Sequence, residues 1–455
     1  MSTVRNELGE ERISRLLVRY GIPAVASSLV SALYNFIDQI FIGNRIGYLG
    51  NAATTVAFPL TILCGATALL FGIGASVLFN IMQGKGNKDA AMQNAGSGIT
   101  FLAIAAAVIG IVVSVLVHPL VYALGATQSV APYAITYIRI IAIGMPFTIF
   151  ATGAGLLIRS DGSPRYSMAV TLTGVGINVV LDYLFLYPLS MGIAGAALAT
   201  VIGQMVSFAM VFWYLLHFKC DRFTRAHLRV SGRAFRSITA IGAPAAVNQA
   251  AMMVMQIVLN NSLKYYGDLS AFGGSEVLAA AGVVAKINML FYCIMIGFSV
   301  GGEPIVGFSY GAGKYDRVKE VYWKTIMIAI SVGLVETLCF WLFPAELAAL
   351  FGSGENGYQE FVVLYMHTFM LLVIISGVPP VSMNLLSSIG KPKTGMIISL
   401  SKQLTLIVLL LILPVFFGLN GVLASGPAAD IIAGAGAALI IRKTFRAMEQ
   451  MGGTQ

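Results

Sequence analysis

A carboxylate and an amide share one face of a long apolar stretch, where ionisable side chains are unusual. The stretch is 171–187, TLTGVGINVVLDYLFLY, in which Asn178 precedes Asp182 by one helical turn. Residues four apart lie on the same side of a helix, so these two side chains point the same way. An ionisable group inside a membrane span is costly and marks a candidate functional site. The pattern predicts a polar helix face directed into a protein interior or an aqueous cavity.

A second acid, Asp38, lies in the apolar stretch LYNFIDQIF, with Tyr34 one turn earlier on its face. Thr200 lies in GIAGAALATVIGQ, whose small residues allow close helix packing; by itself it would be a packing residue. Burial raises the pKa of a carboxyl group, and a second carboxylate nearby raises it further. Two acids in a partly wet cavity can therefore exchange a proton near neutral pH. With an amide and a hydroxyl, the same oxygens suit a hard cation such as sodium.

Plainer interpretations exist for these residues. Asp38 and Asp182 could form a buried ion pair with Arg139 or Lys286, which also fall inside apolar stretches. Asn178 could make an ordinary interhelical hydrogen bond. We favour the functional interpretation, because acids inside membrane spans generally serve ion or substrate pathways.

The composition indicates the elements that must position these side chains. The chain has 455 residues, 58% of them hydrophobic and 10% charged, with a mean hydropathy of +0.85, whereas soluble domains carry roughly 25% charged residues. A spanning helix needs about 20 mostly apolar residues. The sequence predicts an all-α polytopic membrane protein with twelve transmembrane helices, at about 14–42, 53–81, 92–118, 131–158, 165–188, 192–217, 235–265, 276–308, 318–343, 360–388, 394–417 and 419–441.

The basic residues are distributed unevenly between the breaks that separate these stretches. One alternate set of breaks holds almost all of them, beginning with Arg5 and Arg12 at the N-terminus, whereas the opposite set holds Arg45 and Lys264. Lysine and arginine mark the cytoplasmic loops of membrane proteins. We therefore expect both termini in the cytoplasm, and the net charge of +9 is explained without nucleic acid.

The chain also repeats itself. QGKGNKDA (83–90) matches YGAGKYDR (310–317), SDGSPR (160–165) matches SIGKPK (388–393), and GIAG (192–195) matches GLNG (418–421). Each half then has six spans, and parallel repeats of this kind are related by a pseudo-twofold axis along the membrane normal. We expect an N-terminal lobe at 1–217, a basic cytoplasmic linker at 218–234 and a C-terminal lobe at 235–455.

The candidate site occurs in one half only. Across the repeat, Asp38 corresponds to about Leu259, Asp182 to Val408 or Leu409, and Thr200 to Gly426. A feature that the shared fold required would tend to occur in both halves. The asymmetry favours a functional origin.

The same segments resemble a known family of transporters. The chain is similar to the multidrug and toxic compound extrusion (MATE) family over essentially its whole length, through YNFIDQIFIG (34–43), INVVLDYLFLYPLSMGIAGAALAT (177–200), RSDGSPR (159–165), QGKGNKDAA (83–91) and FSYGAGKYDRVKE (308–320). It looks most like the bacterial branch that includes MepA-like and DinF-like pumps. There, the resemblance implies, a cation or proton site in the N-terminal lobe uses the residues that match Asp38, Asn178, Asp182 and Thr200.

The second half offers candidates for substrate binding. Other MATE branches use acids in spans seven and ten; here span seven has Asn248 and Gln249, and span ten has no acid. Glu303 lies deep in span eight and could bind a cationic substrate or pair with Lys402. Methionine adapts its shape, so Met253 and Met289 could line a promiscuous pocket, although core or lipid-facing methionine is commoner. For Glu336 and Asp430 we expect structural pairing.

The function expected from these features is secondary active antiport, with alternating access between the lobes. The protein would export cationic lipophilic compounds in exchange for H⁺ or Na⁺, as a monomer in the bacterial inner (plasma) membrane, without cofactor, nucleic acid or metal other than possible sodium at the first-half site. An alternative is a lipid-linked precursor flippase of the same superfamily, for which a strongly cationic cavity is expected. An enzyme is not expected, because no HExxH motif occurs and the four histidines show no metal-ligand spacing.

Overall fold

A computed structural model of the chain shows helices and no strand among the residues that it describes. These are all residues except 1–7, 47, 125, 127, 350–355 and 453–455. Arg5, which contributed to the predicted orientation, lies outside the described residues. The all-α prediction is confirmed.

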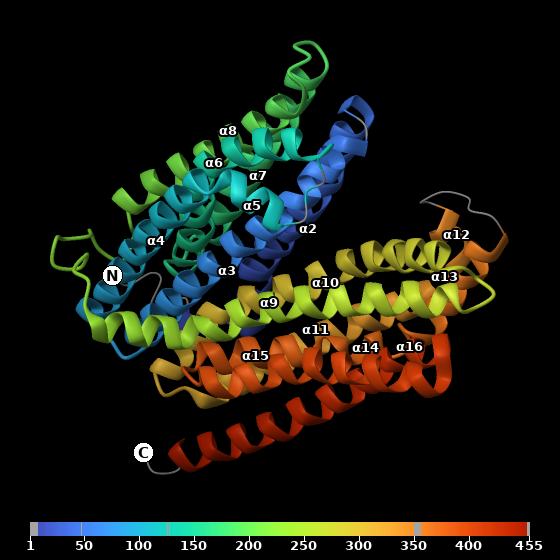
Figure 1. Ribbon diagram of the computed structural model, residues 1–455. Coiled ribbons are helices and arrows are strands. Elements are labelled where there is room, and N and C mark those ends of the chain that lie inside the picture. Colours follow the sequence, from blue (N-terminus) through green and yellow to red (C-terminus); the bar gives the residue numbers. More distant parts are fainter. Residues whose placement is uncertain (1–7, 47, 125, 127, 350–355, 453–455) are drawn as a thin grey trace. The chain divides into compact units, whose positions relative to one another are not determined.

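Most of the helices follow one another with short connections, and a longer segment joins α8 to α9 (Figure 1). They are α2 (Ile13–Ile46), α3 (Tyr48–Gly84), α4 (Lys88–Val115), α5 (Val117–Ala123), α6 (Ala131–Ser160), α7 (Pro164–Leu186), α8 (Gly192–Leu216), α9 (Gly232–Asp268), α10 (Gly274–Gly311), α11 (Tyr315–Leu342), α12 (Pro344–Ala349), α13 (Asn356–Thr368), α14 (Val373–Ser376), α15 (Val378–Ser388) and α16 (Pro392–Gly452). Ten of the described helices are long and apolar enough to cross a membrane.

Three of the predicted spans take a less regular form. The tenth is bent by 58° between Gln359–Thr368 and Val373–Ser388, which brings the number of candidate spans to eleven if the pair is one span. The last two form the two legs of α16, which meet at Gly418, where the backbone has φ 56° and ψ −137°. A side chain rarely adopts this conformation, so glycine suits the turn. With α16 counted as two legs, the predicted twelve spans are all accounted for.

The chain divides into two compact units. The first contains 1–12, 22–246 and 307–312, and the second contains 13–21, 247–306 and 313–455. The boundary therefore cuts α2, α9 and α10, and in α2 and α9 it falls within two residues of Pro23 and Pro244.

In the first unit, α3, α4, α6 and α8 pack around a continuous apolar core. The rings of Phe71 and Phe101 stack at 5.8 Å between centroids. A Cβ atom at Gly72 would lie 2.7 Å from the backbone oxygen of Gly153, so α3 and α6 approach at a contact that leaves no room for side chains. Small residues at helix contacts are typical of membrane bundles, in which van der Waals packing drives association.

The second unit has its own core, which α9, α10, α11, α13 and α16 contribute. Its ring contacts include Tyr365 stacked on Phe369, with 4.8 Å between centroids. A Cβ atom at Gly333 would lie 2.7 Å from the Cα atom of Ile374, so α11 and α14 are also in close contact.

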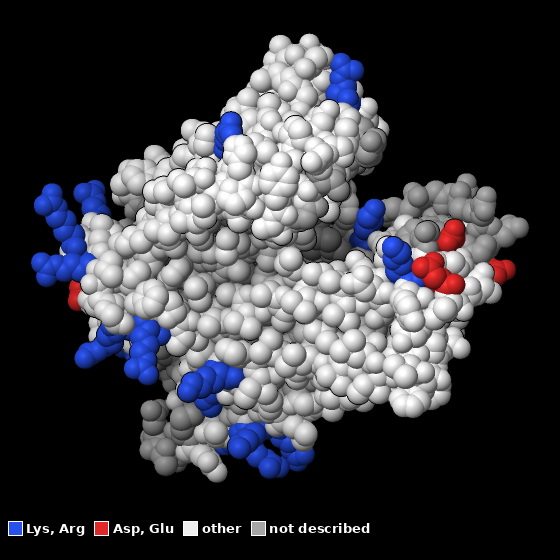
Figure 2. All heavy atoms as spheres, in the orientation of Figure 1, with Lys and Arg blue, Asp and Glu red and all other residues white. Residues whose placement is uncertain are grey.

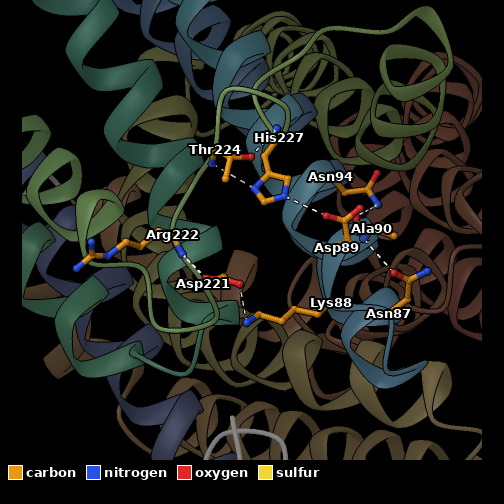
Figure 3. Close-up of polar contacts among 9 residues, drawn as sticks. All are labelled: Asn87, Lys88, Asp89, Ala90, Asn94, Asp221, Arg222, Thr224 and His227. Atoms are coloured by element: carbon orange, nitrogen blue, oxygen red, sulfur yellow. Dashed lines mark hydrogen bonds and ion pairs between the residues drawn. The ribbon is translucent and has the colours of Figure 1, made fainter.

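The segment between α8 and α9 is held against the first unit. Asp161, buried at the end of α6, accepts hydrogen bonds from the backbone N–H groups of Lys219 (2.6 Å) and Cys220 (2.9 Å) and from the Tyr214 hydroxyl (2.9 Å). Figure 3 shows two further contacts with the start of α4. Lys88 pairs with Asp221 at 2.6 Å, and the His227 ring lies 3.2 Å from Asp89.

Charged side chains lie mainly at the helix ends. On the face drawn in Figure 2, Lys and Arg side chains gather there, and the flanks between are almost free of charge. Such flanks suit a hydrocarbon environment, in which a charge is costly. The chain is a multi-pass membrane protein.

Candidate functional site

The first-unit candidate residues come from three helices, of which α7 and α8 are in close contact. Backbone atoms of α7 approach α8 where two glycines face each other, since a Cβ atom at Gly203 would lie 2.6 Å from the backbone oxygen of Gly174. The same Cβ atom would be 3.1 Å from Cβ of Asn178. The close approach therefore places the Asn178 side chain against α8, one turn from Thr200.

Asn178 is the centre of this site. Its amide lies 3.2 Å from Oγ1 of Thr200, which is in turn 3.4 Å from the hydroxyl of Tyr34. With the amide oxygen facing Thr200, that oxygen also accepts from the Thr200 backbone N–H at 2.9 Å, and the amide nitrogen donates to Oδ2 of Asp182 at 3.2 Å. This orientation satisfies both ends of the amide, and we adopt it.

The two carboxyl groups meet beside this amide. Asp38 of α2 is 8% exposed and Asp182 of α7 is fully buried, and their side chains hydrogen-bond to each other. A hydrogen bond between two carboxyl groups requires a proton on one of them. Oδ1 of each acid has no hydrogen-bond partner among the described residues. The site can therefore share a proton, and it also offers two free oxygens to a small cation.

The structure brings together all five residues predicted for this site. It adds Tyr137 of α6, whose hydroxyl lies within electrostatic range of both acids. Tyr137 could not be identified from the sequence, because it stands in an apolar span without an acid or amide on its face. No ion pair links Asp38 or Asp182 to a basic side chain within the described part of the chain.

The residues predicted for substrate binding are more scattered. Glu303, 7% exposed, lines a small hollow between α10, α11 and α15. Its wall includes polar side chains as well as apolar ones, with Asn384 donating to Ser299 at 2.9 Å and with Thr325 and Ser388 also present.

The other four candidates for substrate binding do not line this hollow. Asn248 accepts a hydrogen bond from Gln403 of α16 at 2.8 Å and lies 3.8 Å from the sulfur of Met252. Gln249 and Met253 are half-buried on α9, and Met289 is 40% exposed on α10.

The remaining intramembrane charges of the second unit have polar partners. Lys402 pairs with Asp430 at 2.7 Å, both on α16. Glu336 of α11 accepts a hydrogen bond from the Asn288 amide of α10 at 2.7 Å. The structural pairing that we expected for Asp430 is therefore present, and the partner of Lys402 is Asp430. Asn288 was not singled out from the sequence.

A comparison with protein families identifies the family of this chain. The model of the MatE family matches residues 23–184 and 244–412, one segment in each half. The chain belongs to the MatE family. The matched segments contain Asp38, Asn178 and Asp182, and the resemblance expected from the sequence is confirmed.

Curated relatives of this MatE protein include multidrug export proteins named MepA. The protein from Staphylococcus haemolyticus (strain JCSC1435) is 24% identical over 437 residues, which cover 91% of this chain and 90% of the relative. The protein from Staphylococcus aureus (strain NCTC 8325 / PS 47) is 23% identical over 445 residues, 94% of this chain and 93% of the relative.

Solved structures of MATE transporters share the fold of this MatE chain. A crystal structure of MATE in complex with MaD3S has a TM-score of 0.91 at 22% identity, covering 99% of this chain and 100% of the other. A MOP superfamily transporter from Pyrococcus furiosus, described as having a binding pocket of reverse polarity that suggests a different function, has a TM-score of 0.90 at 22% identity, covering 99% of each chain. The two-lobed, twelve-helix fold predicted from the sequence is thereby confirmed.

Proposed function

We propose that this MatE protein is a secondary antiporter that exports cationic lipophilic compounds in exchange for protons or sodium. The family membership and the MepA relatives support export of small molecules. The coupling site would consist of Asp38, Asn178, Asp182, Thr200 and Tyr34. The protein would act as a monomer in the bacterial inner membrane, with both termini in the cytoplasm and alternating access between an N-terminal lobe (1–217) and a C-terminal lobe (235–455).

One observation carries this proposal. Two buried carboxyl groups hydrogen-bond to each other, and one of them, Asp182, accepts a hydrogen bond from the Asn178 amide. A merely structural buried acid is normally neutralised by a basic partner, because an unpaired buried charge is costly. Here a transported proton or cation would take the place of that partner. The free Oδ1 atoms, the Asn178 oxygen and the Thr200 hydroxyl are the hard ligands that sodium prefers.

The charge of the site would couple ion and substrate. Without its proton or cation, the site is negative and attracts a lipophilic cation from the cytoplasmic side. Rebinding of the ion from outside removes that attraction and favours release of the substrate. In the second unit, Glu303, Asn248, Gln249, Met253 and Met289 are our candidates for substrate contacts.

The test is efflux of a fluorescent lipophilic cation from proteoliposomes under a proton gradient or a sodium gradient, each imposed separately. We expect one gradient to drive transport by the wild type, and both Asp38→Asn and Asp182→Asn to abolish it. Asp316→Asn, an exposed acid at the start of α11, is the matched control and should transport normally. Unchanged transport in both site variants would show that the two acids are structural.

Flipping of a lipid-linked precursor is the alternative substrate class. It would require a cationic cavity for phosphate. Lys402, which with Arg139 and Lys286 is one of three basic residues deep inside the predicted spans, is neutralised by Asp430. If neither gradient moves the lipophilic cation, flipping of a phosphate-bearing lipid by the same proteoliposomes becomes the next measurement.

A further inference from the structure

The second unit contains a buried acid that the proposed function does not use. Glu336 is fully buried on α11, within a candidate span. The Asn288 amide donates to its Oε1 atom at 2.7 Å, whereas Oε2 has no hydrogen-bond partner among the described residues. A buried carboxylate oxygen without a hydrogen-bond donor is costly. A proton on Oε2, or another donor to it, would remove that cost.

A basic side chain lies near this acid, and it already has another partner. Lys402, on the first leg of α16, is close enough for its charge to act on the Glu336 carboxylate. Its ammonium is 2.7 Å from Oδ1 of Asp430, on the second leg of the same helix. The Lys402 side chain is 28% exposed and that of Asp430 is 10% exposed, so this pair reaches the edge of the buried region.

The other neighbours of Glu336 carry no competing charge among the described residues. α10 presents the neutral amide of Asn288, and α14 packs its backbone at Ile374 against Gly333 of α11. The ring of His367 on α13 stacks on Trp341, more than one helical turn along α11 from Glu336. With both acids ionised, Glu336, Lys402 and Asp430 together carry one net negative charge, and a single proton makes the group neutral.

The place of this group in the repeat is informative. The repeat pairs α7 with the first leg of α16 and α8 with the second leg, through SDGSPR with SIGKPK and GIAG with GLNG. Lys402 and Asp430 lie within about one helical turn of the positions that correspond to Asn178 and Thr200. Each half therefore has a polar group at a corresponding level of the same two helices, built from different residues.

We propose that Glu336, Asn288, Lys402 and Asp430 form a second proton-binding site within the second unit, in which Glu336 takes up and releases the proton. Asn288 orients the Glu336 carboxyl group by donating to Oε1, and the proton resides on Oε2. The positive charge of Lys402 acts on both Asp430 and Glu336. When Glu336 loses its proton, the Lys402 ammonium turns from Asp430 toward Glu336. This site deepens the proposed antiport and rests on it, since it would add to the protons exchanged for each substrate.

Infrared difference spectroscopy of the purified protein tests the site without any transport. The C=O stretch of a protonated carboxylic acid should disappear as the pH is raised, and Glu336→Gln should remove part of that band. The glutamine can still accept the hydrogen bond from Asn288, so the variant keeps this contact. Glu346→Gln, at an exposed position on α12, is the matched control and should leave the band unchanged.

Two charge variants should shift the titration in opposite directions. Lys402→Met removes the cation that stabilises ionised Glu336, so the Glu336 band should persist to higher pH. Asp430→Asn frees Lys402 for Glu336, so the band should disappear at lower pH. If Lys402→Met does not fold, Lys402→Met/Asp430→Asn removes the ion pair as a whole and should also move the band to higher pH.

Several outcomes would overturn the site. It is wrong if the wild-type band does not change in Glu336→Gln, or if the Lys402 and Asp430 variants leave its midpoint unchanged. In proteoliposomes, Glu336→Gln should export with fewer protons exchanged per substrate, while Asp38→Asn abolishes export. If Asp38→Asn and Asp182→Asn transport normally while Glu336 titrates as predicted, only the antiport site of the first unit is overturned. The two proposals can therefore fail separately.

Discussion

Thr200 shows what a single side chain can contribute to the first-unit site. Its hydroxyl oxygen lies 3.2 Å from the Asn178 amide, 3.4 Å from the Tyr34 hydroxyl and 3.0 Å from the backbone oxygen of Ala196. Thr200→Val keeps the shape and removes the hydroxyl. One hydrogen bond contributes about 1 kcal/mol, so the affinity for the coupling ion should fall roughly fivefold. The measurement is the ion concentration that gives half-maximal transport.

Control variants make that result specific. Thr171→Val, on α7, removes a hydroxyl that bonds to its own helix at Ser167 and should leave the affinity unchanged. An equal loss in both variants would show that any lost hydroxyl in these helices weakens transport, and Thr200 would then have no special role.

Asp161 makes the protein's stability depend on pH. Burial raises its pKa to about 7, although the hydrogen bonds from Lys219, Tyr214 and Cys220 lower it. An unfolded Asp titrates near 3.9, so the folded state holds this proton more tightly. The stabilisation is fully present below about pH 4 and is lost as the pH rises through about 7, with a magnitude of the order of 4 kcal/mol.

The measurement is thermal unfolding of the detergent-purified protein between pH 5 and pH 8. We expect the unfolding temperature of the wild type to fall as the pH rises, and that of Asp161→Asn to change less, because the amide does not titrate. Asp316→Asn should follow the wild type. Parallel pH profiles for wild type and Asp161→Asn would show that Asp161 does not titrate in this range.

The contact between α7 and α8 is the element-scale determinant of the coupling site. A Cβ atom at Gly203 would lie 2.6 Å from the backbone oxygen of Gly174, so Gly203→Ala must push the helices apart. Overpacking of this kind costs about 1–3 kcal/mol. We expect a lower unfolding temperature together with weaker ion coupling, because Thr200 then moves away from Asn178.

Gly176→Ala, on α7, the other helix of this contact, is the matched control. Nothing lies within 4 Å of a Cβ atom at this position, and alanine favours a helix over glycine by about 1 kcal/mol. The protein should be unchanged or slightly more stable, with normal coupling. Equal losses in the two alanine variants would mean that the α7–α8 contact is not what positions Thr200.

For the whole molecule, the distribution of basic residues predicts a topology that can be measured directly. Single cysteines can be introduced at Arg225, exposed between α8 and α9, and at Leu189, 61% exposed between α7 and α8, after replacement of the four native cysteines. A membrane-impermeant maleimide should label Leu189→Cys on intact cells and Arg225→Cys only after permeabilisation. The reverse pattern would place the termini outside.

Much of this protein was determined by the sequence itself. Long apolar stretches with short polar breaks indicate membrane spans. A helix satisfies the hydrogen bonds of its own backbone in lipid, so the spans could be predicted as helices. The internal repeat predicted two halves of six spans. Asp38, Asn178 and Asp182 could be identified because a polar residue in an apolar stretch is costly, and it therefore marks a site.

Only the tertiary structure decided which of these costly residues meet. Asp38 and Asp182 are far apart in the chain, and their shared hydrogen bond depends on how α2 packs beside α7. Tyr137 and Asn288 carry no signal in the sequence, since a single tyrosine or amide in a span is unremarkable until a carboxyl group from another helix lies beside it. The bend of the tenth span and the turn at Gly418 likewise depend on packing, because hydropathy reports how apolar a segment is and not its direction.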